Sequence, residues 1–336
     1  MRDDQTVTIA DVARQAGVSP MTVSKVLRDT GRVSAETRAR VKRAADELGY
    51  VPNGLAGALA ARSTPIVGVL IPSVSDGVYA EVLAGINAVL RPQGFQTFIG
   101  ETFFNPDIEA ALLRTMLPFR PAGLILAGGI ARTPAADRLL LHRATPAVQI
   151  WDGDNPALDA TVGLSHREAG RMAARHFLDL GARHCAYVGA QLQADICARL
   201  RLEGFREGLA EAGATLIEVT DPDLPRQTDT GRDLTARLLS QGVQVDAIHF
   251  LNDAMALGGL RQLFAAGIDV PGDVAVMGFN GTSCATAVRT RLTTLDLPRD
   301  QIGRRAAQAI LSLRATGGTL APLLIAPRLV RGNTTG

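Results

Sequence analysis

TIADVARQAGVSPMTVSKVLRDTGRVSAETRARVKRAADELGYVPNGLAGALAA occupies residues Thr8–Ala61 and decides how the chain begins. Asp11 stands three residues after the opening threonine, which is the spacing of a capping box at a helix start. Gly17 permits a turn, because glycine tolerates positive φ. Ser19 then supplies an N-cap, with Pro20 in the first helical position. The pattern predicts two short helices joined by a tight turn.

Apolar residues mark the inner faces of both helices. On the first helix they are Ile9, Val12, Ala13 and Ala16. On the second, Val23 and Leu27 are expected to face inward, which leaves Met21, Thr22, Ser24 and Lys25 to face outward. A short helix presented in this way is a reader of the DNA major groove. The alternative is a small three-helix bundle that binds no nucleic acid.

The whole stretch resembles the head of the LacI family of bacterial transcription repressors. The resemblance rests on the motifs ADVAxxAGVSxxTVSxVL and GYxPN, within an ungapped match from Val7 to Leu59. It implies that the bases are read by Pro20, Met21 and Lys25. It implies phosphate contacts from Thr8, Ser19, Thr22, Ser24 and Thr37. The family usually has arginine where this chain has Lys25, and lysine lacks the planar fork that grips guanine with two hydrogen bonds.

Residues 52–64 are expected to form a hinge helix and linker between the head, residues 1–51, and the rest of the chain. Asn53 can cap a helix of one or two turns through Leu55, Ala56, Ala58 and Leu59. The glycines at positions 54 and 57 make such a helix marginal, which suits a switch. The resemblance implies that Leu59 wedges between base steps in the minor groove. The alternative is a plain linker.

Charge and composition add little to these motifs. The chain has 35 Lys and Arg against 33 Asp and Glu, and its only lysines are Lys25 and Lys42. Three cysteines and five histidines show neither ligand spacing nor a pairing rhythm. The sequence therefore predicts no metal or cofactor, and thiols that are buried or incidental. With no signal peptide and no apolar run long enough for a bilayer, it predicts a cytoplasmic, nucleoid-associated protein without a membrane partner.

Strands alternate with helices from Ile66 onward. The expected strands are 66–71, 96–99, 123–126, 147–150, 185–188, 247–251 and 274–278. The expected helices are 78–90, 107–117, 167–180, 199–212 and 254–266. Two successive sets of βα units predict two lobes of mostly parallel sheet. Ligands of such sheets bind beyond the carboxyl ends of the strands, here between the lobes.

This region, residues 65–336, resembles the periplasmic-binding-protein-like core of LacI-family repressors, in which the chain crosses between the lobes three times. The crossings are expected near residues 162, 293 and 325. The first lobe then comprises about 65–162 plus 294–324, and the second about 163–293 plus 325–336. The expected fold is an all-α helix-turn-helix head with a hinge helix, joined to a two-lobed α/β core of parallel sheets.

Several core motifs match the family residue by residue and imply an effector site. The segment ARLRL followed by GF places the effector-gripping arginine at Arg201. The NDxxAxG element begins at Asn252, which follows a strand and precedes a helix. Family members often bind a sugar hydroxyl at the position of Asp152. Trp151 and Tyr79 are expected as walls against an apolar sugar face.

Each of these residues has a structural alternative. Arg201 could pair with Glu203 or Glu207 on a solvated face. Asn252 and the aspartate after it could be only a helix cap. Trp151 could belong to the core.

One departure from the family indicates the effector class. The family commonly has aspartate where this chain has Asn280, and an amide there removes a charge that repels anions. Within the family, the core resembles most closely the gluconate-utilisation repressors, through the pattern LxPSxxxxxxAEVLxGI, the turn GFQT and the segment PALD. The predicted effector is gluconate or another aldonate, with Arg226 as a second positive contact. Alternatives are a neutral sugar or a nucleobase.

The predicted function is that of a repressor, a non-enzymatic DNA-binding regulator controlled by this effector. Two-fold proteins read pseudo-palindromic operators, so a homodimer is expected. A sugar-acid transport protein shares the core but not the head. An enzyme is disfavoured because the chain has none of the motifs GxxxxGK[ST], GxGxxG or GxSxG. Whether the effector induces or co-represses stays open, since both outcomes use the same parts.

Overall fold

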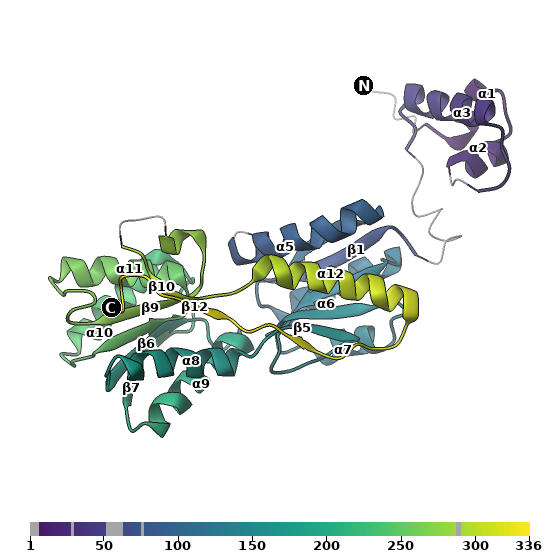
Figure 1. Ribbon diagram of the computed structural model, residues 1–336. Coiled ribbons are helices and arrows are strands. Elements are labelled where there is room, and N and C mark those ends of the chain that lie inside the picture. Colours follow the sequence, from purple (N-terminus) through teal and green to yellow (C-terminus); the bar gives the residue numbers. More distant parts are fainter. Residues whose placement is uncertain (1–6, 28–29, 52–62, 75–76, 287–289) are drawn as a thin grey trace. The chain divides into compact units, whose positions relative to one another are not determined.

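The computed structural model describes residues 7–27, 30–51, 63–74, 77–286 and 290–336 (Figure 1). The chain divides into two compact units, Met1–Thr64 and Pro65–Gly336. All the residues of the expected hinge helix, including Asn53 and Leu59, lie outside the described ranges.

The head contains three helices, α1 (Ile9–Ala16), α2 (Pro20–Leu27) and α3 (Ala35–Leu48). The capping box is confirmed, because the Thr8 hydroxyl accepts from Asp11 N and the Asp11 carboxylate accepts from Thr8 N. Gly17 ends α1 with a φ of 62°, and the Ser19 hydroxyl accepts from the amide of Thr22 at the start of α2. Local capping chemistry therefore fixes the turn between the first two helices.

The inner face of α2 differs slightly from the prediction. Val23 is buried as expected, but the second fully buried side chain is Val26, and Leu27 is only partly buried. Positions three and four residues after Val23 share one helix face, so both pack inward to different extents. The buried residues of α3 complete the small core of the head.

The first lobe of the core unit is built on a sheet in the order β11-β5-β4-β3-β1-β2, and all its pairings are parallel. Its strands are β1 (Ile66–Ile71), β2 (Gln96–Glu101), β3 (Gly123–Ala127), β4 (Ala147–Asp152), β5 (Ala160–Leu164) and β11 (Leu323–Leu324). Its helices are α5 (Gly77–Leu90), α6 (Pro106–Met116), α7 (Pro134–Leu141) and α12 (Arg299–Thr316). Short 3-10 turns follow two of them, η1 (Arg91–Gln93) and η2 (Leu117–Phe119).

The second lobe repeats this plan with the strand order β12-β10-β9-β8-β6-β7. Its strands are β6 (His184–Ala190), β7 (Thr215–Asp221), β8 (Ala247–Phe250), β9 (Ala275–Asn280), β10 (Thr293–Asp296) and β12 (Arg328–Val330), the last antiparallel to β10. Its helices are α8 (His166–Asp179), α9 (Ile196–Glu211), α10 (Thr228–Ser240) and α11 (Asp253–Ala265), with a 3-10 turn η3 (Ser283–Thr286). The predicted fold class, a helix-turn-helix head and a two-lobed core of parallel sheets, is confirmed.

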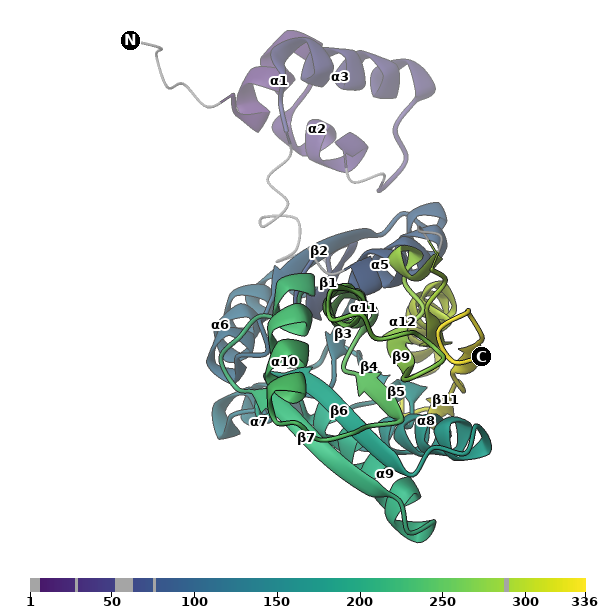
Figure 2. The same cartoon turned by 90° about the vertical axis from the view of Figure 1, so that its left-hand side faces the viewer.

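Alternating side chains bury both faces of each sheet. In the first lobe, Val69 packs on the side of α5 and α12, and its neighbour Leu70 packs on the side of α6 and α7. In the second lobe, α8 packs against α9 and α10 against α11, and Figure 2 shows these pairs around β6, β7 and β9. Among the described residues, no helix is both long enough and apolar enough to span a bilayer.

The chain passes between the sheets three times, close to the expected positions but not at all of them. The passages lie between β5 and α8, between β10 and α12, and between β11 and β12. Residues 163–164 therefore belong to the first sheet and residues 294–296 to the second, which corrects the expected limits at 162 and 293. The reason is that β5 pairs with β4 as far as Leu164, and β10 pairs with β9 as far as Asp296.

Candidate functional site

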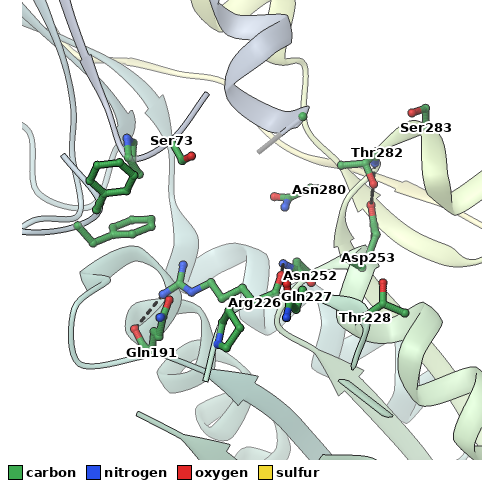
Figure 3. Close-up of a pocket in the computed structure, with 16 residues that line it drawn as sticks. Ser73, Gln191, Arg226, Gln227, Thr228, Asn252, Asp253, Asn280, Thr282 and Ser283 are labelled. Carbon is green, nitrogen blue, oxygen red and sulfur yellow. Dashed lines mark hydrogen bonds between the residues drawn. The ribbon is translucent and has the colours of Figure 1, made fainter. Parts of the chain in front are cut away.

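An open cavity of about 640 Å³ lies where the strands of both lobes end (Figure 3). A smaller pocket of about 40 Å³ adjoins it, and we call the two the outer cleft and the inner pocket. Four residues line both spaces: Phe104, Arg226, Asn252 and Asn280. The carboxyl ends of the strands in doubly wound sheets are where ligands bind, so the position matches the prediction.

Six of the seven residues predicted to bind an effector line these two spaces. They are Tyr79, Trp151, Arg201, Arg226, Asn252 and Asn280. Asp152 lines neither. Its buried carboxylate accepts from the amides of Asp154 and Asn155, so it holds its own loop. Burial raises the pKa of Asp152, which the hydrogen bonds from Asn155 partly offset.

Arg201 is the most deeply buried cation of the inner pocket, with 4% of its surface exposed. One of its nitrogens lies 3.2 Å from His166 Nδ1, another donates to the Leu251 carbonyl at 2.9 Å, and the guanidinium stacks on the Phe279 ring. Among the described carboxylates, none forms a salt bridge with Arg201. The alternative that Arg201 pairs with Glu203 or Glu207 is wrong.

Arg167 forms ion pairs with Glu203 and Glu207 instead, because it lies on α8 directly beside them. Helices α8 and α9 approach closely at two glycines, and this packing sets the outer ion pairs apart from Arg201 on the buried side of α9.

Arg226 joins the inner pocket through a buried ion pair. It donates to the Asp195 carboxylate at 2.6 Å and to the Gln191 carbonyl at 2.8 Å. Burial alone raises the pKa of Asp195, but the charge and hydrogen bond of Arg226 outweigh it, so the pKa lies below its usual value. The buried Arg226 Nε atom has no hydrogen-bond partner in the part of the chain that the structure describes, and the guanidinium lies 4.7 Å from the centre of the Phe104 ring.

Asn252 is the N-cap of α11 and also lines the cavity. Its side-chain oxygen accepts from Met255 N, and its side-chain nitrogen donates to the Arg226 carbonyl. The next residue, Asp253, is buried and accepts from Thr282 and Thr294. Burial raises the pKa of Asp253, and those hydrogen bonds oppose the rise.

Aromatic rings form one wall of the inner pocket. The Tyr79 and Trp151 ring centroids are 5.6 Å apart, and Trp151 lies 6.1 Å from the His166 ring. Trp151 is 7% exposed and therefore belongs both to the core and to the pocket lining. Burial and the Arg201 charge lower the pKa of His166 to about 4, so its ring is neutral near pH 7 and Nδ1 accepts from Arg201.

Among the lining residues that sequence reasoning did not identify are Asp195, Phe104 and Phe279. Asp195 is the N-cap of α9, and Phe104 is one of two consecutive phenylalanines with φ above 50°. A cap position was readable from the sequence. The pairing of Asp195 with Arg226 was not, because it joins residues 31 positions apart.

Cys185 and Cys197 are buried free thiols. Burial raises the pKa of Cys185 to about 12 and that of Cys197, which lines the inner pocket, well above its usual value. Within the described ranges, no three His, Cys, Asp or Glu side chains are grouped so that they could hold a metal ion.

The predicted DNA-reading residues lie on α2 and around it. Met21 is 69% exposed and Lys25 is exposed as well, one turn further along the helix. The predicted phosphate contacts Thr8, Ser19, Thr22, Ser24 and Thr37 are exposed or partly exposed, and Thr37 accepts a hydrogen bond from Ser34. The head thus presents a short helix, α2, whose inner face buries Val23 and Val26 and whose outer face carries exposed or partly exposed side chains.

Comparison with known proteins decides the family. The family model described as bacterial regulatory proteins, lacI family, matches residues 8–53, and a periplasmic binding protein-like domain matches residues 174–335. The HTH-type transcriptional regulator GntR of Pseudomonas aeruginosa is 41% identical over 310 residues, which is 92% of this chain and 89% of that protein. The chain belongs to the LacI family of bacterial regulatory proteins.

Solved structures of family members agree in fold. A LacI-family transcriptional regulator from Silicibacter pomeroyi superposes with a TM-score of 0.92 at 39% identity, covering 98% of this chain and 99% of that one. The lac repressor dimer, bound to operator and an anti-inducer, gives a TM-score of 0.84 at 27% identity, with 98% and 99% covered. This LacI-family chain is a DNA-binding transcriptional regulator.

Proposed function

We propose that this regulator is a repressor whose operator binding is controlled by an aldonate, with gluconate as the first choice. The observation that carries the proposal is the charge balance of the inner pocket. Two guanidiniums, those of Arg201 and Arg226, face one carboxylate, Asp195. A buried excess of positive charge favours an anion.

The polyol part of an aldonate suits the rest of the lining. Asn252, Asn280 and Gln191 offer amide groups, which both donate and accept hydrogen bonds. Tyr79 and Trp151 offer an apolar wall that excludes water from the hydrogen bonds. A neutral sugar satisfies the amides but leaves the Arg226 Nε atom without an anionic acceptor. The predicted role of Asp152 as a hydroxyl ligand requires its carboxylate to leave the loop that it holds.

We assign operator reading to Pro20, Met21 and Lys25, with Leu59 as the wedge in the minor groove. Support comes from the exposure of Met21 and Lys25 on α2 and from the family match over residues 8–53. Residues 52–64 serve as the hinge and linker in this proposal. Effector binding changes the closure of the lobes, and the hinges transmit that change to the operator.

A homodimer completes the proposal, because one short reading helix spans too few base pairs. The exposed edge strand β2 carries Phe98 and Ile99, which are 49% and 41% exposed, and Phe119 lies nearby at 38%. Phe98, Phe119 and Met116 line an apolar groove on the first lobe. Covering an exposed apolar edge is a reason for two copies to pair.

The test is a thermal shift of the intact protein with gluconate, other aldonates, glucose, ribose and purines. A ligand at 100 times its Kd stabilises the folded state by about 2.7 kcal/mol, which raises the Tm by several degrees. We expect a shift with gluconate or a close aldonate and none with glucose. A shift with a neutral sugar or purine, and none with any aldonate, rejects the effector class and leaves the DNA-binding regulator in place.

A further inference from the structure

Arg299 is a buried cation between the lobes that the effector assignment does not use. It is the first residue of α12, where the chain returns from the second sheet to the first, and 6% of its surface is exposed. Its guanidinium donates to the carbonyl oxygens of Asn280 and Gly281 at the end of β9. It also donates to both carboxylate oxygens of Glu81 on α5, at 3.1 and 3.2 Å.

The backbone that Arg299 holds has an unusual conformation. Asn280 has a φ of 107° and Gly281 a φ of 67°, so two consecutive residues lie at positive φ. A residue other than glycine keeps a positive φ only when the surrounding structure holds its backbone in place. Gly281 is also tightly enclosed by Asp296, whose carboxylate lies 3.6 Å from Arg299.

This conformation directs the Asn280 side chain into the cavity. In Figure 3 the Asn280 amide projects into the open space, apart from Asp253 and Thr282. Glu81, another partner of Arg299, lies on α5. The first turn of this helix brings Val78 and Tyr79 to the inner pocket. Arg299 therefore links the two elements that approach the site from opposite lobes.

We propose that Arg299, anchored by Glu81, is a positioning residue that fixes Asn280 in the effector site and ties its loop to α5. The fork geometry of arginine suits this task, since one guanidinium serves two carbonyls and a carboxylate at once. Arg299 itself lines neither cavity. Its contribution to effector affinity therefore passes through Asn280. The inference rests on the proposed function, because gluconate is the ligand used to measure it.

The binding arm of the experiment compares R299Q with R304Q in the intact protein by calorimetry with gluconate. Arg304 is the matched control, because it lies on the same helix and, of the described carboxylates, pairs only with the exposed Asp300. We expect R299Q to weaken gluconate binding about tenfold or more, and R304Q to leave it within about twofold. A milder pair, E81Q against D300N, serves if R299Q does not fold, with an expected loss of about threefold for E81Q.

A double mutant distinguishes a role of Arg299 in positioning Asn280 from a role in stabilising the fold. If Arg299 acts through Asn280, adding R299Q to N280A changes gluconate affinity by no more than about twofold. If the two losses simply add, Arg299 supports the fold rather than Asn280, and the proposal is wrong. Equal gluconate affinity of R299Q and wild type also overturns it.

Hydrogen exchange of the ligand-free protein supplies a readout that does not depend on the effector. R299Q should speed amide exchange in residues 279–282 and in the first turn of α5, and R304Q should not. If wild type fails to bind gluconate, the proposed function fails, while this arm still decides the positioning role. Unchanged exchange in both segments rejects that role even where gluconate binds.

Discussion

The inner pocket joins two arginines that the chain separates by 25 positions, and each is held differently. Arg201 relies on a neutral histidine, a carbonyl and an aromatic ring, whereas Arg226 has a carboxylate of its own. Only Arg226 is therefore neutralised locally. The amide of Asn280 lines the same pocket and adds no negative charge to it.

N280D should weaken gluconate binding, because the new carboxylate repels the carboxylate of the ligand. The expected loss is about 1–2 kcal/mol, or roughly ten- to thirtyfold in Kd. Calorimetry at constant ionic strength measures it, and glucose serves as the neutral comparison ligand. Unchanged gluconate affinity in a folded N280D protein would place the ligand charge away from Asn280.

Acid should destabilise the core through its buried histidines. His166 has a pKa of about 4 in the folded state against 6.5 in its usual state, and burial lowers the pKa of His249 to about 3. Between these values the unfolded chain binds more protons than the folded chain. The contribution of these histidines to the free energy of unfolding is therefore fully present above pH 6.5 and is lost as the pH falls toward 4.

H166N tests this directly, since the asparagine oxygen can replace Nδ1 as the acceptor for Arg201. Wild type should lose about 2 kcal/mol between pH 7 and pH 5 through His166 alone, and the variant should lose that much less. Urea unfolding at the two pH values gives the difference, with His249 contributing equally in both proteins. Identical pH slopes would mean that His166 is charged or hydrated in the folded state.

Whether a site residue could be predicted from the sequence depends on how far along the chain its partners lie. Arg201 and Asn252 lie in local motifs, so a resemblance located them. Asp195 and Arg299 act through partners 31 and 218 positions away, and no local pattern specifies those pairings. Asp152 matched by position, yet its carboxylate is engaged by the loop that follows it.

At the scale of elements, close helix pairs set the positions of the site residues. A Cβ added at Gly204 on α9 would overlap the Arg167 carbonyl on α8, and one added at Gly170 on α8 would overlap the Arg201 carbonyl. Glycine is required at these two places because the backbones touch. The helix that carries Arg201 is therefore located by backbone contact as well as by side-chain packing.

G204A should lower the Tm of the core, because the helices must separate to admit one methyl group. Overpacking of this kind costs about 1–3 kcal/mol, which corresponds to a fall of roughly 2–6 °C in a core of this size. Calorimetry of the variant measures the fall. G77A is the matched control, since a Cβ at Gly77 on α5 meets no atom within 4 Å. Equal Tm values for G204A and G77A would contradict the close contact.

Elements whose apolar residues form a clear local pattern were predictable from the sequence. The buried strands β1 and β3 read as apolar runs, and the helix predicted at 78–90 corresponds to α5 (Gly77–Leu90). Strand β7 was not predicted, because it is an edge strand with only Val219 fully buried and no apolar run. The two-residue strand β11 pairs with distant β5, and nothing local marks it.

At the scale of the whole molecule, the proposed homodimer predicts that operator binding needs two paired chains. F98D introduces a charge on the exposed edge strand β2, so it should shift the protein from dimer to monomer and abolish tight operator binding. Gluconate binding, which uses one chain, should persist. Sedimentation at micromolar concentration gives the mass, and L141D is the control, because Leu141 on α7 is even more exposed at 76%. A dimeric F98D protein would move the interface elsewhere.

The central claim is that one chain couples an aldonate to an operator. The most direct measurement is operator affinity of the intact protein, by fluorescence anisotropy on a duplex selected from pseudo-palindromic sequences, with and without gluconate. We predict that gluconate changes operator affinity by about 5- to 150-fold, that the operator changes gluconate affinity by the same factor in the same direction, and that glucose does neither. Operator affinity that is identical at zero and saturating gluconate would contradict the account.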